Sequence, residues 1–245
     1  MRIVVIGATS AIAEHCCREW LKQGTADLLL VARDTARAGR IAEDLAVRSP
    51  GSTIEVTSVD FLDPQAIDAL AERAAERPVD VVLIAHGVLP EQASLQQDLV
   101  KCRDTLAVNA LSPALFAEAF AARLEKAGHG TLAIIGSVAG DRGRKSNYVY
   151  GSAKGLLARY AEGLQHRLAR TGVSVVLVKP GPTDTPMAGT HRARGLRLAP
   201  VDAVARDIVR GIAARRAVVY TPGRWALIML IVRHLPRFVF NRLDI

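Results

Sequence analysis

The sequence predicts an α/β protein in which one doubly wound parallel sheet carries helices on both faces. Short, almost continuous apolar runs rich in Val, Ile and Leu alternate with longer segments rich in Ala, Leu, Glu and Arg, where apolar residues recur at helical spacing. Strands of a parallel sheet are buried on both faces and therefore read as continuous apolar runs. The first run also leads directly into a glycine-containing turn that begins a helix, which is typical of such sheets.

Seven apolar runs have the length and composition of strands. The segments between them include residues 63–77 and 112–128, whose apolar positions follow a helical period. A chain of 245 residues, half of them hydrophobic, can bury one substantial core, so we expect a single domain over residues 1–245. The expected strands lie at residues 3–6, 28–32, 54–59, 79–85, 131–136, 173–178 and 217–222.

Composition limits the classes of partner and compartment. The net charge of +8 suits an anionic cofactor, an anionic substrate or an anionic membrane surface, and it does not choose among them. Cys16, Cys17 and Cys102 are odd in number and lack a C-x-x-C spacing, so we expect no disulfide framework, no metal site and a reducing cytoplasm. The N-terminal apolar run is too short for a signal peptide, and no apolar run has the length of a spanning helix. We expect no nucleic-acid partner.

The first strand runs into the turn GATSAIAEHCCREW, which opens a helix. Gly7 allows the backbone to turn sharply, and the N–H groups at the start of the helix can hold a pyrophosphate. A strand followed by glycine and a helix is also ordinary in α/β proteins, so this turn alone does not establish a nucleotide site.

A second pattern indicates proton transfer. Tyr150 and Lys154 are four residues apart in a helical segment, so their side chains can share one site. A phenol is a poor acid or base at neutral pH, but a nearby ammonium lowers its pKa and makes proton transfer with an alcohol or carbonyl feasible. Ser137 follows an apolar strand 13 residues upstream, where its hydroxyl can hold a substrate oxygen, and Asn109 interrupts an apolar helix.

This ordered series resembles the short-chain dehydrogenase/reductase family, whose fold is Rossmann-like. The similarity covers residues 1 to about 187, with the segments GATSAIA, AHG, VNA, GSVAG, YGSAK and KPGPTDTPM. It implies that Tyr150 is the general acid/base and that Lys154 lowers the pKa of Tyr150 and binds the nicotinamide ribose. It further implies that Ser137 orients the substrate oxygen and that Asn109 holds a water of the proton relay.

The resemblance also implies an NAD(P)(H)-dependent enzyme that transfers a hydride between the nicotinamide and a carbonyl or secondary alcohol. The remaining residues that match cofactor-contacting positions of the family follow the first, second, third, fourth and sixth expected strands. They are Gly7, Thr9, Ser10, Ile12, Arg33, Asp60, Phe61, Ala85, Gly87, Pro180, Gly181, Thr183 and Thr185.

Some positions depart from the family pattern. The second and third glycines of the turn are Ala11 and Ala13, whose methyl groups can widen the turn or weaken pyrophosphate binding, although we expect binding to survive. His86 stands where the family has asparagine, and we favour a structural histidine over one that faces the cofactor. Tyr148 lacks a lysine four residues on, so we interpret it as a packing or substrate contact.

The end of the second strand favours NADP(H) over NAD(H). A carboxylate at this point would bind the adenosine ribose and repel a 2′-phosphate, but the chain has Ala32, followed by the guanidinium of Arg33. Asp34 and the absence of a second basic residue in the glycine turn leave NAD(H) possible, and Arg33 can equally be a solvated loop charge.

Substrate choice is expected to depend on the variable region at residues 186–216 and on an apolar and basic tail at residues 224–245. The tail can lie in a membrane interface or pack on its own domain or a second subunit. With the context of Tyr150, it is similar to the reductases that act on decaprenylphosphoryl keto-pentose, which implies a lipid-linked carbonyl substrate.

Other interpretations remain open from the sequence. They are a reductase of another small or lipophilic carbonyl, and a non-catalytic NADP-binding sensor or interaction protein. The family resemblance further implies a homodimer or homotetramer. We expect a cytoplasmic protein, with possible peripheral contact at the inner membrane surface through the tail.

Overall fold

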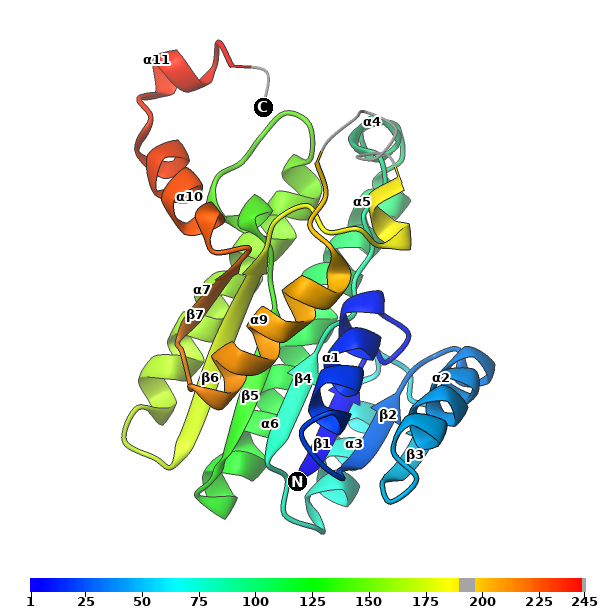
Figure 1. Cartoon of the computed structure of the whole chain (residues 1–245). Helices are drawn as coiled ribbons and strands as arrows, with labels where there is room; N and C mark the ends of the chain where they lie inside the picture. The colour runs from blue at the N-terminus through cyan, green and yellow to red at the C-terminus, as the bar shows by residue number, and fades with distance from the viewer. Residues whose placement is uncertain (190–196, 244–245) are drawn as a thin grey trace.

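Seven parallel strands form the centre of the protein in a computed structural model, which describes residues 1–189 and 197–243 (Figure 1). Within these residues the strands are ordered β3-β2-β1-β4-β5-β6-β7 and all pair in parallel. They are β1 (Arg2–Ile6), β2 (Asp27–Val31), β3 (Thr53–Thr57), β4 (Val81–Ile84), β5 (Gly130–Ile135), β6 (Val173–Pro180) and β7 (Val218–Thr221).

Helices cover both faces of this sheet, as predicted (Figure 1). Successive side chains of a strand point to opposite faces, so β1 contributes Ile3 and Val5 to one core and Val4 and Ile6 to the other. The first core is closed by α1 (Ala11–Leu21), α2 (Thr35–Arg48) and α9 (Val201–Ala213). The second is closed by α3 (Pro64–Ala75), α6 (Ser112–Ala127) and α7 (Tyr148–Leu168).

Short elements surround the C-terminal edge of the sheet. Asp34, Asp63 and Asp98 cap α2, α3 and α5 by accepting hydrogen bonds from backbone N–H groups, which a helix start otherwise leaves unpaired. These short elements are α4 (Gln92–Gln97), α5 (Leu99–Leu106), the π-helical η1 (Ala107–Leu111), the 3-10 turns η2 (Val138–Asp141) and η3 (Pro186–Ala188), α10 (Arg224–His234) and α11 (Arg237–Phe240).

Residues Leu99–Ala127 form one continuous helical segment that is long and apolar enough to cross a membrane by length and composition. The sequence analysis expected no segment of this kind. It missed Leu99–Ala127 because scattered polar residues interrupt the apolar run. More than half of its most apolar window is buried inside the protein, and Phe116 and Phe120 lie in the core beneath α3 and α7. This segment is therefore the core helix of the second layer.

The predicted strand positions agree with the structure to within two residues at each end. The variable region at 186–216 contains η3 and α9, but its residues 190–196 lie outside the described residues, as do residues 244–245 of the tail. The strand order reverses between β1 and β4, and ligands of doubly wound sheets bind beyond the carboxyl ends of the strands at such a point.

Candidate active site

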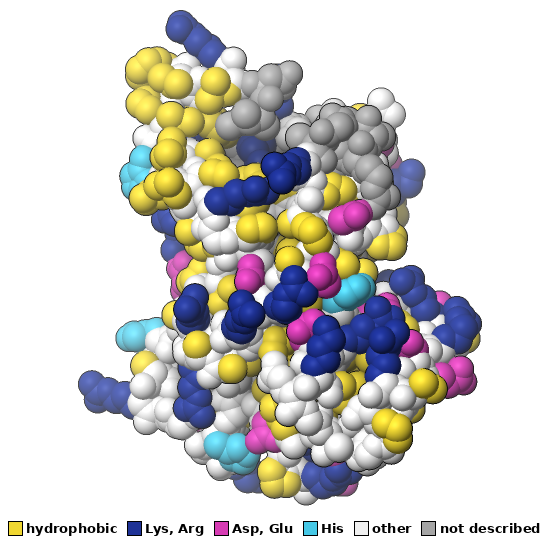
Figure 2. Space-filling model, in the orientation of Figure 1, with side chains coloured by type: hydrophobic (Ala, Val, Ile, Leu, Met, Phe, Trp, Pro, Cys, Tyr) yellow, Lys and Arg dark blue, Asp and Glu magenta, His cyan; other side chains and the backbone are white. Residues whose placement is uncertain are grey.

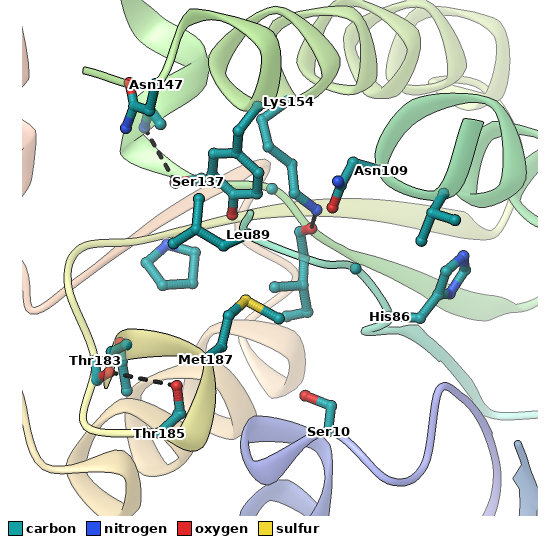
Figure 3. A pocket seen from close by; sticks show the side chains of 18 of the residues that line it. Ser10, His86, Leu89, Asn109, Ser137, Asn147, Lys154, Thr183, Thr185 and Met187 are labelled. Atoms are coloured by element: carbon teal, nitrogen blue, oxygen red, sulfur yellow. Dashed lines mark hydrogen bonds between the residues drawn. The ribbon is translucent and has the colours of Figure 1, made fainter. Parts of the chain in front are cut away.

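A cavity of about 1500 Å³ opens at the carboxyl ends of the strands (Figure 3). All four predicted catalytic residues line it, and so do all the predicted cofactor contacts. Its wall comes from the ends of β1, β2, β4, β5 and β6 and from α7 and α10. The fold therefore brings residues from Gly7 to Thr185 to one site, as the sequence predicts.

The turn after β1 is built for close approach of a ligand to the backbone. Gly7 has φ +83°, and a Cβ there would lie 2.7 Å from the Cβ of His86, so only glycine fits. Ser10 begins α1 without a side-chain capping bond, and Figure 3 shows its hydroxyl pointing into the cavity. Ala11 lines the cavity, whereas the methyl group of Ala13 is buried in the core. Of the two departures from the family pattern, only Ala11 can meet a pyrophosphate.

Two guanidinium groups lie where β2 ends. Arg33 lines the cavity and is exposed, and so is Arg37, in the first turn of α2. Asp34 is used as the cap of α2, because its carboxylate accepts a hydrogen bond from the N–H of Arg37 at 2.9 Å. The sequence interpretation missed Arg37, because Arg33 precedes the Asp34 cap and the helical spacing of four residues does not apply to this pair. On the same side of the cavity, Asp60 accepts from the N–H of Leu62 and Phe61 is buried.

Tyr150, Ser137 and Lys154 form the centre of the candidate site. Ser137 and Tyr150 both line the cavity, and the Ser137 hydroxyl, which lowers the pKa of the Tyr150 phenol, accepts from the N–H of Ala139 at 3.1 Å. The Lys154 ammonium lies 5.9 Å from the centre of the Tyr150 ring and donates to the carbonyl of Ile135 at 2.9 Å. Ser137 caps η2 just after β5, and Figure 3 shows Lys154 reaching into the cavity.

Burial dominates the acid–base properties of this group. It raises the pKa of the Tyr150 phenol, an effect that the Ser137 hydroxyl opposes, and it lowers the pKa of the Lys154 ammonium to about 8. Lys154 is not among the groups that act on the Tyr150 pKa here, so its lowering of that pKa stays a prediction. A lysine with a pKa near 8 is still mostly charged at neutral pH.

Asn109 connects the π-helical stretch to the loop after β4. The side chain is fully buried, donates to the carbonyls of Val88 and Thr105 at 2.9 Å, and accepts from the N–H of Val88 at 3.0 Å. A Cβ at Gly87 would lie 2.6 Å from the Asn109 Oδ1, so a side chain there would displace Asn109. In this structure Asn109 holds the loop backbone that carries Gly87 and Val88.

His86 lines the cavity, and its Nδ1 is buried without a hydrogen-bond partner in the described part of the chain, so the structural role favoured from the sequence stays a prediction. Its Nε2 lies 2.9 Å from the hydroxyl of Ser112, and its ring makes edge contacts with Phe61 and Phe116. Burial, the Lys154 ammonium and Arg33 lower the pKa of His86 to about 3, so the imidazole is neutral at pH 7.

The segment after β6 closes the opposite end of the cavity. Thr183 is buried and donates to the carbonyl of Gly181 at 2.9 Å, and Thr185 donates to the carbonyl of Thr183 at 3.5 Å (Figure 3). Trp225 of α10 packs against Gly181 so closely that no Cβ could be placed there. The tail therefore contributes to the cavity wall through Trp225, Ile228, Met229 and Val232.

This inward face of α10 was missed at the sequence level. Residues 225, 228, 229 and 232 follow the i, i+3, i+4, i+7 pattern of a packed helical face, a signal obscured because the whole helix is apolar. Arg142, just after η2, donates to the carbonyls of Val232 and Leu235 and stacks on the ring of Phe240 at 3.8 Å. The tail is thereby fastened to the loop that follows Ser137.

Other predicted residues lie away from the chemistry. Tyr148 is 42% exposed and does not line the cavity, so it is not a second candidate phenol. Cys16 and Cys17 are buried, and burial raises the pKa of both thiols, that of Cys17 to about 12, which makes them inert structural residues. In the described part of the chain, no cluster of His, Cys, Asp or Glu could hold a metal ion.

The residues of the cavity fit a dinucleotide. The positive φ of Gly7 and the unbonded Ser10 hydroxyl leave room and donors for a pyrophosphate, and Arg33 and Arg37 supply positive charge at one end. At the other end, the Ser137 and Tyr150 hydroxyls and the Lys154 ammonium can bind an oxygen that gains or loses a proton.

Comparisons with known proteins agree with this geometry. The model of the family described as short chain dehydrogenase matches residues 1–195. Uncharacterised oxidoreductases of Streptomyces coelicolor and Mycobacterium tuberculosis are 34% and 32% identical, each over 98% of this chain and 95% and 96% of their own length. A short-chain dehydrogenase of Sphingobium yanoikuyae in complex with NADPH is 25% identical with a TM-score of 0.81, and 97% of both chains is covered. The chain is therefore an oxidoreductase that belongs to the short-chain dehydrogenase family.

Proposed function

We propose that the protein is an NADPH-dependent reductase of a lipophilic ketone, in which Tyr150 is the proton donor. The observation that carries the proposal is the grouping of Ser137 and Tyr150 beside the buried Lys154, at the wall of one large cavity. When bound, the nicotinamide supplies the hydride for the carbonyl carbon. Ser137 orients the carbonyl oxygen, and the phenol of Tyr150 gives that oxygen its proton.

Lys154 favours this step through its charge. Its pKa of about 8 leaves most of the ammonium protonated at neutral pH, and a positive charge beside Tyr150 stabilises the phenolate that remains after proton transfer. Asn109 keeps the loop after β4 in place through its three hydrogen bonds with Val88 and Thr105. It is thus a positioning residue in the geometry described, in addition to the water-holding role that the family implies.

The test is the variant Tyr150→Phe, measured for NADPH binding by fluorescence and for turnover of a panel of ketones. We expect NADPH binding to remain and kcat to fall about 10²- to 10⁴-fold, the range attributed to general acid–base catalysis. Wild-type protein that binds NADPH but reduces no ketone would instead support the alternative of a non-catalytic sensor.

The preference for NADP(H) is the second part of the proposal, with NAD(H) as the alternative. Arg33 and Arg37 both line the cavity. A hydrogen bond from a charged guanidinium to a phosphate contributes more binding free energy than a hydrogen bond between neutral groups. We expect Arg33→Ala and Arg37→Ala each to weaken NADPH binding about tenfold and NADH binding little. Arg40→Ala, also exposed on α2 but outside the cavity, is the control. Equal affinity of the wild type for both nucleotides would contradict the preference.

The apolar wall of α10 supports a lipophilic substrate. Trp225, Met229 and Val232 present apolar surface to the cavity beside the segment after β6. A keto-sugar carried on a polyprenyl phosphate remains one candidate, and ketones with long alkyl chains are the others. A series of methyl ketones of increasing chain length tests whether the substrate is lipophilic. For a lipophilic substrate site, kcat/KM should rise with each CH₂ group that becomes buried in the cavity.

The outer face of the tail supports peripheral membrane contact. Leu230 and Ile231 of α10 and Phe238 of α11 are more than half exposed, and Figure 2 shows hydrophobic side chains gathered over this region. Arg233 and Arg237 are exposed among them, and a basic, apolar surface suits anionic lipids. We propose a cytoplasmic protein that binds the inner membrane surface through this face. Flotation with phosphatidylglycerol vesicles should be lost in the double variant Leu230→Gln/Ile231→Gln.

A homodimer or homotetramer is proposed through a different surface. Leu111 at the end of η1 and Leu156 on α7 are each about half exposed, and an apolar helical face of this kind is suited to a second copy. Light scattering should give a dimeric or tetrameric mass for the wild type and a lower mass for Leu156→Arg. If Leu230→Gln/Ile231→Gln lowers the mass instead, the tail is the subunit contact.

A further inference from the structure

The loop between Ser137 and Tyr150 places a third arginine, after Arg33 and Arg37, at the cavity. Arg144 lines the cavity and is half-buried, and its Nε is buried without a hydrogen-bond partner in the described part of the chain. Its backbone carbonyl accepts from the N–H of Asn147 at 3.1 Å, which fixes the turn on which it stands. The unpartnered Nε distinguishes Arg144 from Arg142, whose guanidinium donates to the carbonyls of Val232 and Leu235 in the tail.

The charge of Arg144 is not matched by an ion pair in the described residues. Asp141 is an acidic group that raises the pKa of Arg144, but one oxygen of its carboxylate binds the Lys179 ammonium at 2.5 Å and the other accepts from the hydroxyl of Tyr220 at 2.7 Å. Burial lowers the pKa of Arg144, yet a guanidinium stays charged in proteins. A buried donor without a partner is unfavourable, so a group such as the Arg144 Nε is usually paired.

Other unpaired donors line the same cavity. The Nε2 of Gln92 on α4 and the Nε1 of Trp225 on α10 are buried without hydrogen-bond partners in the described part of the chain. Gln92 is held in place because its Oε1 accepts from the N–H of Val149 at 3.1 Å. The cavity-lining carboxylates are Asp34 and Asp60, at the β2 and β3 side, and Glu91, which is exposed. The cavity that Arg144 lines therefore holds these two unpaired donors, together with one buried unpaired acceptor, the Oδ1 of Asn147.

We propose that Arg144 is a specificity-determining residue that binds an anionic group, a carboxylate or phosphate, carried by the ketone substrate. Its place in the chain, seven residues after Ser137 and six before Tyr150, puts it on the loop that joins the two residues around the reacting carbonyl. A guanidinium can bind both oxygens of a carboxylate or phosphate, which fixes the orientation of the carbonyl as well as its affinity. The inference rests on the proposed ketone reduction and names the class of substrate for that site.

Isothermal titration of NADP⁺-saturated protein tests this with two matched pairs of probes. The first is 4-oxo-4-phenylbutanoate and its methyl ester, and the second is dihydroxyacetone phosphate and dihydroxyacetone. The wild type should bind the charged member of at least one pair about tenfold or more tightly than the neutral one. The pair with the larger difference in affinity shows whether the site prefers a carboxylate or a phosphate.

Three variants complete the test. In Arg144→Gln the affinity ratio within the pair should fall toward one, and Arg144→Lys should keep part of it because the charge remains. Arg159→Gln, at an exposed arginine of α7 that pairs with Glu162 and lies outside the cavity lining, should keep the wild-type ratio. The proposal is overturned if wild-type protein shows no preference for either anion, or if Arg144→Gln keeps the preference.

Failure of the proposed function is recognised separately. Nucleotide binding is measured by fluorescence before the titration, and a protein that does not bind NADP⁺ contradicts the reductase proposal. The four probes are then titrated against the free protein, where the same affinity ratios decide the anion site. If Arg144→Gln weakens NADP⁺ binding tenfold and leaves the anion preference unchanged, Arg144 binds the nucleotide and the substrate proposal is wrong.

Discussion

Trp225 lies directly on Gly181, and the contact leaves no space for a side chain at that glycine. Gly181 follows β6 in the segment that carries Thr183, and Trp225 begins the inward face of α10. One packing contact thus joins the predicted cofactor segment to the tail that forms the apolar wall. The position of α10, and with it the shape of the substrate end, depends on the absence of a methyl group at residue 181.

Gly181→Ala should therefore displace the indole ring. We expect a loss of about 1–3 kcal/mol in the free energy of unfolding, the usual cost of overpacking, and a fall in kcat/KM for apolar ketones. Gly163→Ala on α7 is the matched control, since a Cβ there meets nothing within 4 Å, and it should raise stability by up to about 1 kcal/mol. Urea unfolding gives the free energy of unfolding of both variants. Equal stability of the two would show that the Trp225 contact is not tight.

Lys154→Met should separate stability from activity. Because burial lowers the folded-state pKa of Lys154 to about 8, below its ordinary value of 10.5, the unfolded chain binds more protons between these two values. The buried ammonium thus costs stability below pH 8, and this cost disappears as the pH rises toward 10.5. Each unit of pKa difference corresponds to about 1.4 kcal/mol.

We expect Lys154→Met to be inactive and to be more stable than the wild type at pH 7 by about 1–3 kcal/mol. This gain is smaller than the free energy that corresponds to the whole pKa shift of Lys154, because the carbonyl of Ile135 loses its hydrogen-bond donor. The difference should shrink between pH 8 and pH 10. Urea unfolding at pH 7, 8, 9 and 10 tests this, and a difference that does not change with pH would contradict the lowered pKa.

His86 should remain neutral across the physiological range. Its pKa of about 3 lies below the ordinary value of 6.5, so the unfolded state binds the extra proton between these values and stability falls as the pH drops from 6.5 toward 3. In an NMR titration the His86 ring signals should not move between pH 5 and pH 8. A midpoint near 6 for His86 would show that the ring is hydrated rather than buried.

The sheet was predictable because each parallel strand is a buried apolar run, and the order of Asn109, Ser137, Tyr150 and Lys154 along the chain indicated one site. The inward face of α10 was not predictable, since an all-apolar helix does not show from its sequence which side is buried. Contacts between distant segments were equally hidden. The sequence holds no sign that Arg142 binds the carbonyls at the end of α10, or that Asp141 is already paired with Lys179 and so leaves Arg144 unmatched.

Arg142→Ala should loosen the tail without unfolding the sheet. Arg142 supplies donors to the carbonyls of Val232 and Leu235, which the end of α10 leaves unpaired, and it stacks on Phe240. We expect faster trypsin cleavage at Arg233 and Arg237, a change of less than about 2 kcal/mol in global stability, and a several-fold rise in KM for apolar ketones with a smaller change in kcat. Arg142→Lys should restore little, because an ammonium cannot reproduce the planar stacking of the guanidinium. Cleavage at the wild-type rate in Arg142→Ala would show that packing of Trp225 and Met229 alone holds the tail in place.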